Sequence, residues 1–185
     1  MIETLIRKVA EQLDKEKIPY MIIGGQAVLI YGRPRLTRDI DITLGIDTDK
    51  FSLIEKICNQ LKLRMLVEKP EDFAVKTKVL PAEEQESKIR VDFVFSFTQY
   101  EAQAIKNAKR VQVGDYPVNF ASREDVIIHK MVAGRAVDEE DVKSILAKKS
   151  QTIDLEYIRK WLSEFAQIQE YSRILEQFNS LLKSK

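Results

Sequence analysis

The stretch that decides the fold is Asp39-Ile40-Asp41-Ile42-Thr43. Acidic and apolar side chains alternate in it with a period of two, which is typical of a strand buried on one face. Asp39 and Asp41 then point to the same side of the strand, while Ile40 and Ile42 enter the core. Two neighbouring carboxylates repel each other unless a cation or several donors neutralise them, so the pattern predicts a divalent metal site. Mg²⁺ suits it, because this ion takes oxygen ligands and keeps positions open for substrate phosphates.

A glycine pair precedes this stretch and strengthens the prediction. Residues 19–23 indicate a strand, Gly24 and Gly25 a turn, and residues 26–31 a short helix. Glycine lets the backbone approach a triphosphate closely, and the first N–H groups of the helix then face the phosphates. A lone Gly-Gly pair is a common turn, but its combination with the Asp-Ile-Asp strand is far more specific.

A third acid, Asp92, interrupts an apolar run over residues 88–95 that otherwise indicates a buried strand. If this strand lies beside that of Asp39 and Asp41, the three carboxylates are able to seat two ions about 3.5–4 Å apart, as in-line phosphoryl displacement requires. Asp92 would then bind the catalytic metal and accept the proton of an attacking hydroxyl.

The rest of the chain predicts an α/β portion over residues 1–121 and a helical segment over residues 122–185 that packs on it. Residues 32–38 form a basic loop, residues 83–87 a hairpin loop, and Gly114-Asp115 the turn of a second hairpin. Ser122, with Asp125 three residues later, predicts the start of a helix over residues 123–133. Helices are also expected over residues 2–16, 49–62 and 98–108, strands over 63–68, 73–80, 110–113 and 117–120, and joints in the helical segment at 151–152 and 167–169.

Composition excludes several classes of protein. The chain has 185 residues, with 30 Lys and Arg against 29 Asp and Glu, so no global field draws it onto nucleic acid. No apolar run approaches the roughly 18 residues of a membrane span, which predicts a cytoplasmic protein without a membrane partner. The single cysteine, Cys58, lies in an apolar helical pattern that favours a buried side chain.

Several of these motifs resemble the nucleotidyltransferase superfamily of DNA polymerase β and kanamycin nucleotidyltransferase. The segment from Gly32 to Asp41 resembles more closely the AbiEii/MenT-type toxins and their small bacterial relatives, and so does the segment from His129 to Asp141. The motifs that carry the wider resemblance are Ile23-Gly24-Gly25, residues 33–38, Asp39-Ile40-Asp41 and Val91-Asp92-Phe93, within a span of about residues 18–145.

The resemblance implies an α+β polymerase β-like fold, a mixed sheet with flanking helices followed by a C-terminal helical segment. It implies a Mg²⁺-dependent enzyme that moves a nucleoside monophosphate from a nucleoside triphosphate, such as ATP, to a hydroxyl acceptor. The acceptor stays open between tRNA, protein and a small molecule, and the protein partner between a cognate antitoxin and a second copy of the chain. The residues concerned are Asp39, Asp41 and Asp92 at the metal, Gly24, Gly25, Arg38 and Lys130 at the nucleotide, and Asp138 and Asp141 as support.

Other interpretations of the same residues stay open. Asp39 and Asp41 are compatible with an exposed edge strand, and Asp92 with a structural ion pair to a neighbouring Arg or Lys. The arginines of residues 33–38 are compatible with a solvated loop, and Lys130 with a surface lysine. The alternatives in function are a non-catalytic nucleotide-binding or toxin–antitoxin module that keeps the fold, and a hydrolase that uses the same acids on water.

Overall fold

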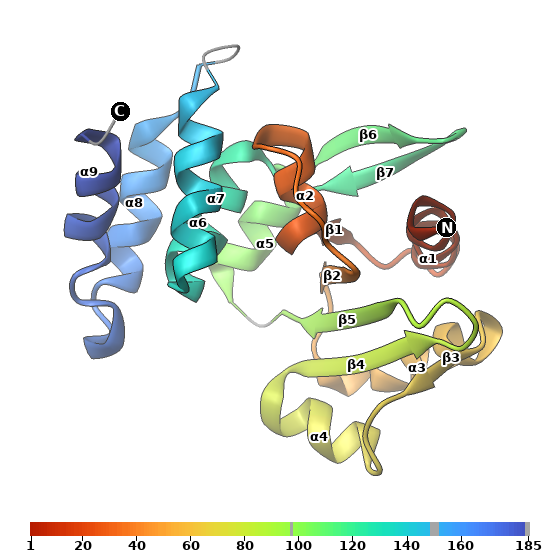
Figure 1. Ribbon diagram of the computed structural model, residues 1–185. Coiled ribbons are helices and arrows are strands. Elements are labelled where there is room, and N and C mark those ends of the chain that lie inside the picture. The colour runs from red at the N-terminus through yellow and green to blue at the C-terminus, as the bar shows by residue number, and fades with distance from the viewer. Residues whose placement is uncertain (97, 149–151, 184–185) are drawn as a thin grey trace. The chain divides into compact units, whose positions relative to one another are not determined.

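The computed structural model describes residues 1–96, 98–148 and 152–183 (Figure 1). The chain divides into two compact units. The sheet unit consists of Met1–Gln26 and Leu36–Ala121, and the helical unit of Ala27–Arg35 and Ser122–Lys185. The packing of the helical segment on the α/β portion stays a prediction.

A mixed sheet forms the centre of the sheet unit. Among the described residues it has seven strands in the order β3-β4-β5-β2-β1-β7-β6. The pairs β2–β5 and β1–β7 are parallel, and the other four pairs are antiparallel. The strands are β1 (Tyr20–Ile22), β2 (Asp39–Leu44), β3 (Leu63–Met65), β4 (Val79–Glu84), β5 (Arg90–Phe95), β6 (Lys109–Val113) and β7 (Tyr116–Phe120).

Helices lie between the strands of this sheet in the order of the chain, which confirms the predicted α+β architecture (Figure 1). The amphipathic pattern of the first residues forms α1, whose buried face includes Leu5, Val9 and Leu13. Asp47 accepts a hydrogen bond from the Thr48 backbone N–H and starts the 3₁₀ turn η1, which leads into α3. The helices of this unit are α1 (Ile2–Lys15), η1 (Thr48–Lys50), α3 (Phe51–Gln60), α4 (Pro70–Thr77) and α5 (Gln99–Lys106), with the start of α2 (Gly24–Tyr31).

The strand predicted over residues 73–80 is wrong. Most of this stretch belongs to helix α4, and only its last two residues enter β4. Pro70 occupies the first turn of α4, where its missing N–H costs no hydrogen bond, and two acidic residues follow it in the same turn. Lys78 then ends the helix in the left-handed region, with φ of 59°. These end signals outweigh the alternation of apolar residues that suggested a strand.

Some element boundaries also differ from the prediction, and the strand expected over residues 63–68 ends at Met65. Gly24 and Gly25, predicted as a turn, are the first residues of helix α2. Strand β4 continues to Glu84, so the loop expected over residues 83–87 is shorter, and the Glu84 carboxylate accepts hydrogen bonds from the backbone N–H and hydroxyl of Ser87.

The helical unit is built from four helices in the described residues beyond Ala121, together with the end of α2. Ser122 accepts a hydrogen bond from the Asp125 backbone N–H at the start of α6, and Gly134 ends α6 with φ of 63°. Helix α6 contacts the other three. They are α6 (Arg123–Ala133), α7 (Ala136–Ala147), α8 (Leu155–Phe165) and α9 (Ile174–Lys183), with the 3₁₀ turn η2 (Gln169–Tyr171) before α9. Of the joint predicted at 151–152, residue 151 lies outside the described residues.

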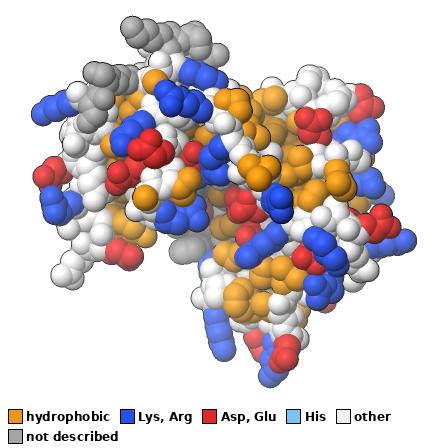
Figure 2. All heavy atoms as spheres, viewed as in Figure 1, with side chains coloured by type: hydrophobic (Ala, Val, Ile, Leu, Met, Phe, Trp, Pro, Cys, Tyr) orange, Lys and Arg blue, Asp and Glu red, His pale blue; other side chains and the backbone are white. Residues whose placement is uncertain are grey.

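No helix in the described ranges combines the length and the apolar character that a membrane crossing requires. On the face drawn in Figure 2, basic and acidic side chains are interspersed, which agrees with the near-zero net charge of the chain.

Candidate active site

Strands β2 and β5 bring the predicted acids together at the centre of the sheet. They pair in parallel, with Asp41 directly opposite Asp92 and Asp39 opposite Arg90. Directly opposed residues on neighbouring strands point to the same face of a sheet and lie about 5 Å apart. Ile40 is fully buried and lies one residue out of phase with the acids, on the opposite face. Asp39, Asp41 and Asp92, called here the carboxylate cluster, therefore share one face.

Gly24 lies against this cluster at the start of α2. Its φ is +63°, and a Cβ atom at this position would lie 1.9 Å from Oδ2 of Asp41. Any side chain here would displace the Asp41 carboxylate, and the positive φ also favours glycine. The positive end of the α2 helix dipole favours a negative group at this place.

The first turn of α2 is also tied to strand β2 by polar contacts. The Gln26 side chain is buried and donates a hydrogen bond of 3.2 Å from Nε2 to the backbone carbonyl of Asp39. The Ile23 N–H donates to the Asp41 carbonyl at 2.9 Å. Sequence reasoning missed Gln26, although a polar residue directly after the glycine pair and before an apolar run was a signal for it.

Arg90 forms the ion pair with Asp92 that the sequence left open as an alternative. Its Nε donates to Oδ1 of Asp92 at 2.7 Å, and its side chain is about half exposed whereas that of Asp92 is 17% exposed. The hydrogen bond to Asp92 raises the pKa of Arg90, burial opposes this, and the charges of Asp92, Asp41 and Asp39 raise it further. The pKa of Arg90 therefore depends on the charges of all three acids of the carboxylate cluster. Its position two residues before Asp92, on the same face of a strand, was the signal that predicts the pair.

The cluster is chemically suited to a hard divalent cation, because carboxylate oxygens are the ligands that Mg²⁺ prefers. Within the described residues, however, no three His, Cys, Asp or Glu side chains already surround a common point. Asp92 holds Arg90, and Asp39 accepts a hydrogen bond of 2.7 Å from the Thr37 hydroxyl. A cation would therefore compete with these partners for the carboxylate oxygens.

The remaining predicted nucleotide contacts lie in different surroundings. Gly25 is buried in the first turn of α2, and Arg38 is exposed in the segment that leads into β2. Lys130 belongs to the helical unit and is not a surface lysine, since its side chain is only 5% exposed.

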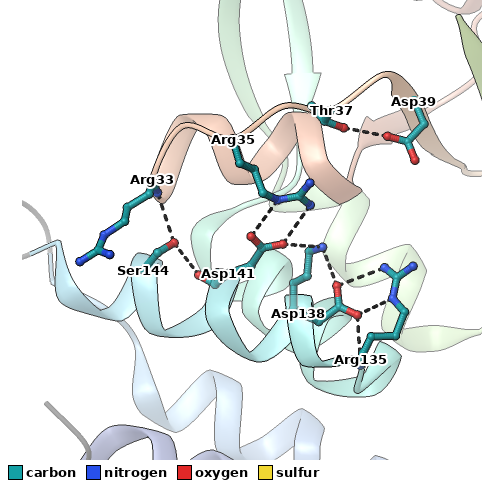
Figure 3. A network of polar contacts seen from close by, with 9 residues as sticks. Arg33, Arg35, Thr37, Asp39, Arg135, Asp138, Asp141 and Ser144 are labelled. Carbon is teal, nitrogen blue, oxygen red and sulfur yellow. Dashed lines mark hydrogen bonds and ion pairs between the residues drawn. The ribbon is translucent and has the colours of Figure 1, made fainter.

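Lys130 lies between two buried acids of α7, Asp138 and Asp141; Figure 3 shows these acids with the arginines that pair with them. Its Nζ is 2.7 Å from Oδ1 of Asp138 and 2.9 Å from Oδ2 of Asp141. Arg35 donates two hydrogen bonds of 2.9 and 3.0 Å to Asp141, and Arg135 holds Asp138 at 2.6 and 3.1 Å. These five residues are called the lysine network. Burial would raise the pKa of Asp138, but the hydrogen bonds from Arg135 and Lys130 outweigh it and lower this pKa.

The mixed sheet, the carboxylate face and the helix that starts at Gly24 together define a nucleotidyltransferase-like fold. The chain belongs to the family described as "Nucleotidyl transferase of unknown function (DUF2204)", which matches residues 2–180. A search of curated protein sequences gave no match.

Solved structures agree on the fold. An antigenic nucleotidyltransferase-like protein from Paracoccidioides brasiliensis is 17% identical with a TM-score of 0.56, covering 95% of this chain and 92% of its own. ANT(2″)-Ia, crystallised with adenylyl-2″-tobramycin, is 20% identical with a TM-score of 0.54, covering 96% and 97%. The lincosamide antibiotic adenylyltransferase LnuA, bound to lincomycin, is 15% identical with a TM-score of 0.52, covering 74% and 91%. The expected closer relation to AbiEii/MenT-type toxins stays a prediction.

Proposed function

We propose that this protein transfers a nucleoside monophosphate from a nucleoside triphosphate to a hydroxyl acceptor, with Mg²⁺ bound by Asp39, Asp41 and Asp92. The observation that carries the proposal is the pairing of Asp41 with Asp92 on one sheet face, against the glycine that begins α2. The family of this chain is described as a nucleotidyl transferase of unknown function. One fold relative was crystallised with adenylyl-2″-tobramycin, and another is a lincosamide antibiotic adenylyltransferase.

At the α-phosphorus the reaction forms one bond and breaks one, and the acceptor hydroxyl gives up its proton. The acceptor oxygen attacks the α-phosphorus, the bond from that phosphorus to the oxygen bridging to the β-phosphorus breaks, and pyrophosphate leaves. Bound Mg²⁺ supplies charge neutralisation on the phosphates. Asp92 takes the proton of the attacking hydroxyl, and its carboxylate is released from Arg90 to do so.

The glycines and the basic residues hold the nucleotide. Gly24 and Gly25 give the phosphates access to the N–H groups at the start of α2, where the helix dipole favours negative charge. Arg38, exposed directly before β2, contacts the phosphates or the base. A phosphate contact from Lys130 requires that Nζ loosen one of its two aspartate partners, so this role rests on the sequence resemblance alone.

A labelling experiment tests the proposal. The protein is incubated with Mg²⁺ and each of the four α-³²P-labelled triphosphates, with RNA, protein extract or a small-molecule pool as acceptor. We expect label on one acceptor class, its loss in Asp41→Asn, and its retention in Asp72→Asn, which removes an exposed acid of α4 instead.

Two outcomes contradict the proposal. Nucleotide binding without transfer to any acceptor would favour the non-catalytic module, and nucleotide breakdown without acceptor would favour the hydrolase. The cytoplasmic location expected from the composition stays a prediction, as do the toxin–antitoxin setting and the antitoxin or homo-oligomer partner implied by the resemblance.

A further inference from the structure

A pocket of about 440 Å³ lies within the helical unit, and the proposed reaction does not use it. Its walls come from the loop after α2, one face of α7 and the end of α9. They include Arg33, Arg35, Val137, Lys143, Ser144 and Leu181. The volume falls in the range of roughly 300–1,000 Å³ that is typical of small-molecule sites.

Among the charged side chains that line this pocket, one basic group has no acidic partner within the described residues. Asp141 is neutralised by Arg35 and by Lys130, and Glu140 is held by Lys143 at 2.7 Å. The guanidinium of Arg33 is exposed and forms no hydrogen bond or ion pair with the part of the chain that the structure describes. Figure 3 shows it pointing away from the lysine network. Arginine in such a position is suited to a phosphate, which it binds through two parallel N–H groups.

The loop that carries Arg33 is held in place before any ligand arrives. The Arg33 backbone N–H donates to the Ser144 hydroxyl at 3.2 Å, and that hydroxyl donates to the Asp141 carbonyl at 2.8 Å. A Cβ atom on Gly32 would lie 2.5 Å from the same Ser144 oxygen, so the backbone approaches α7 as closely as glycine allows. Two residues later, Arg35 fixes the loop to Asp141. Binding of a ligand to Arg33 therefore costs little backbone entropy, because the loop is already ordered.

The other half of the pocket is apolar. Val137 is 45% exposed and Ala147 is also exposed, whereas Leu146 and Leu181 line the pocket as buried side chains. An inorganic phosphate would leave Val137 and Ala147 uncovered, whereas the sugar and base of a nucleotide would cover them.

We infer that this pocket is a second phosphate-binding site, which takes a nucleotide through Arg33 either as a free monophosphate or as a residue of single-stranded RNA. This site goes beyond the proposed function, because it requires neither the carboxylate cluster nor nucleotidyl transfer.

The test measures binding in EDTA, so that metal-dependent triphosphate binding does not contribute. The probes are adenosine 5′-monophosphate, followed by calorimetry, and a labelled single-stranded RNA 12-mer, followed by fluorescence anisotropy. Arg33→Gln should weaken binding roughly tenfold, the loss expected for one charge-assisted hydrogen-bonding group. For RNA, the slope of log affinity against log salt should fall in magnitude by about 0.7, the value for one phosphate contact on a single strand.

Two further variants make the result specific. Arg159→Gln removes an exposed arginine of α8 with the same change in net charge and should leave both affinities unchanged. Val137→Asp places an acid at the exposed apolar wall and should weaken binding with Arg33 intact. Binding of the monophosphate identifies a free-nucleotide site, and binding of RNA alone identifies a phosphodiester site. The inference is overturned if neither probe binds, or if Arg33→Gln binds as well as Arg159→Gln.

Discussion

Replacing Gly24 with alanine tests whether the glycine pair is needed to seat the Asp41 carboxylate. The chain offers a matched control in Gly114, at the turn between β6 and β7. The two glycines have φ of +63° and +64°, but a Cβ on Gly114 would meet no atom within 4 Å. Both substitutions carry the same left-handed backbone cost of about 1–2 kcal/mol. Only the substitution at Gly24 also collides with a side chain.

The size of this collision predicts the effect on activity. The new Cβ would lie 1.9 Å from Oδ2 and 2.8 Å from Cγ of Asp41. The oxygen must retreat by roughly 1.5 Å to reach ordinary van der Waals contact. A displacement of about 1 Å at a reacting centre costs on the order of a hundredfold in rate. Gly24→Ala should therefore lower nucleotidyl transfer at least about a hundredfold, while Gly114→Ala keeps the wild-type rate.

Urea denaturation and the labelling assay measure the two effects separately. Gly24→Ala should be less stable than Gly114→Ala. This excess should disappear when both substitutions are compared in an Asp41→Gly background, which removes the carboxylate together with the Cβ atom that would lie 3.1 Å from the new methyl group. If Gly24→Ala transfers label as fast as Gly114→Ala, or if its excess instability persists without the Asp41 carboxylate, the close approach of these groups has no role.

Three further predictions concern charged or titratable side chains. Arg90→Gln should change the free energy of unfolding by less than about 1 kcal/mol, because the Arg90 side chain is about half exposed. It should tighten Mn²⁺ binding severalfold in calorimetry, because it frees the Asp92 carboxylate. Weaker Mn²⁺ binding would mean that Arg90 supports the metal site. Lys130→Met should destabilise the fold by about 3 kcal/mol in urea denaturation, since it leaves buried carboxylates without their shared cation, and an unchanged midpoint would contradict that burial. Burial, with a smaller contribution from the Lys130 charge, lowers the pKa of His129 to about 4, below its ordinary 6.5, so the unfolded chain binds the proton first as pH falls. The free energy of unfolding should therefore be unaffected by His129 above pH 6.5 and should fall by about 3 kcal/mol as the pH is lowered from 6.5 to 4. In pH-dependent melting, a His129→Gln variant should show no such fall in this range.

The face of the acids was predictable from sequence, but the register of their strands was not. A period of two in residues 39–43 determines which side chains share a side, because it follows from strand geometry alone. The pairing of Asp41 with Asp92 joins strands that are far apart in the chain, and only tertiary structure selects it.

The missed helix α4 shows where local patterns conflict. Residues 73–80 alternate well enough to suggest a strand, yet Pro70 and the acids after it are helix-start signals. Here the end signals outweighed the apolar pattern within one short segment.

The lysine network shows a different limit. The spacing of Asp138 and Asp141 on one helix face is readable, but the same residues are compatible with a surface pair or with a buried site. The burial of these acids depends on how α7 packs against residues 27–35. The same packing brings Arg35, which is distant in the sequence, into contact with Asp141. The sequence alone is therefore compatible with a solvated loop at Arg35, and the structure shows that this interpretation is wrong for Arg35, which pairs with Asp141.

The measurement that tests the central claim most directly is Mn²⁺ binding in the presence of a non-hydrolysable nucleoside triphosphate, followed by calorimetry. The account predicts metal binding that is enhanced by the nucleotide and lost in both Asp41→Asn and Asp92→Asn, with Asp72→Asn unchanged. Equal Mn²⁺ affinity in the wild type and in the two cluster variants would show that these strand acids do not hold the metal.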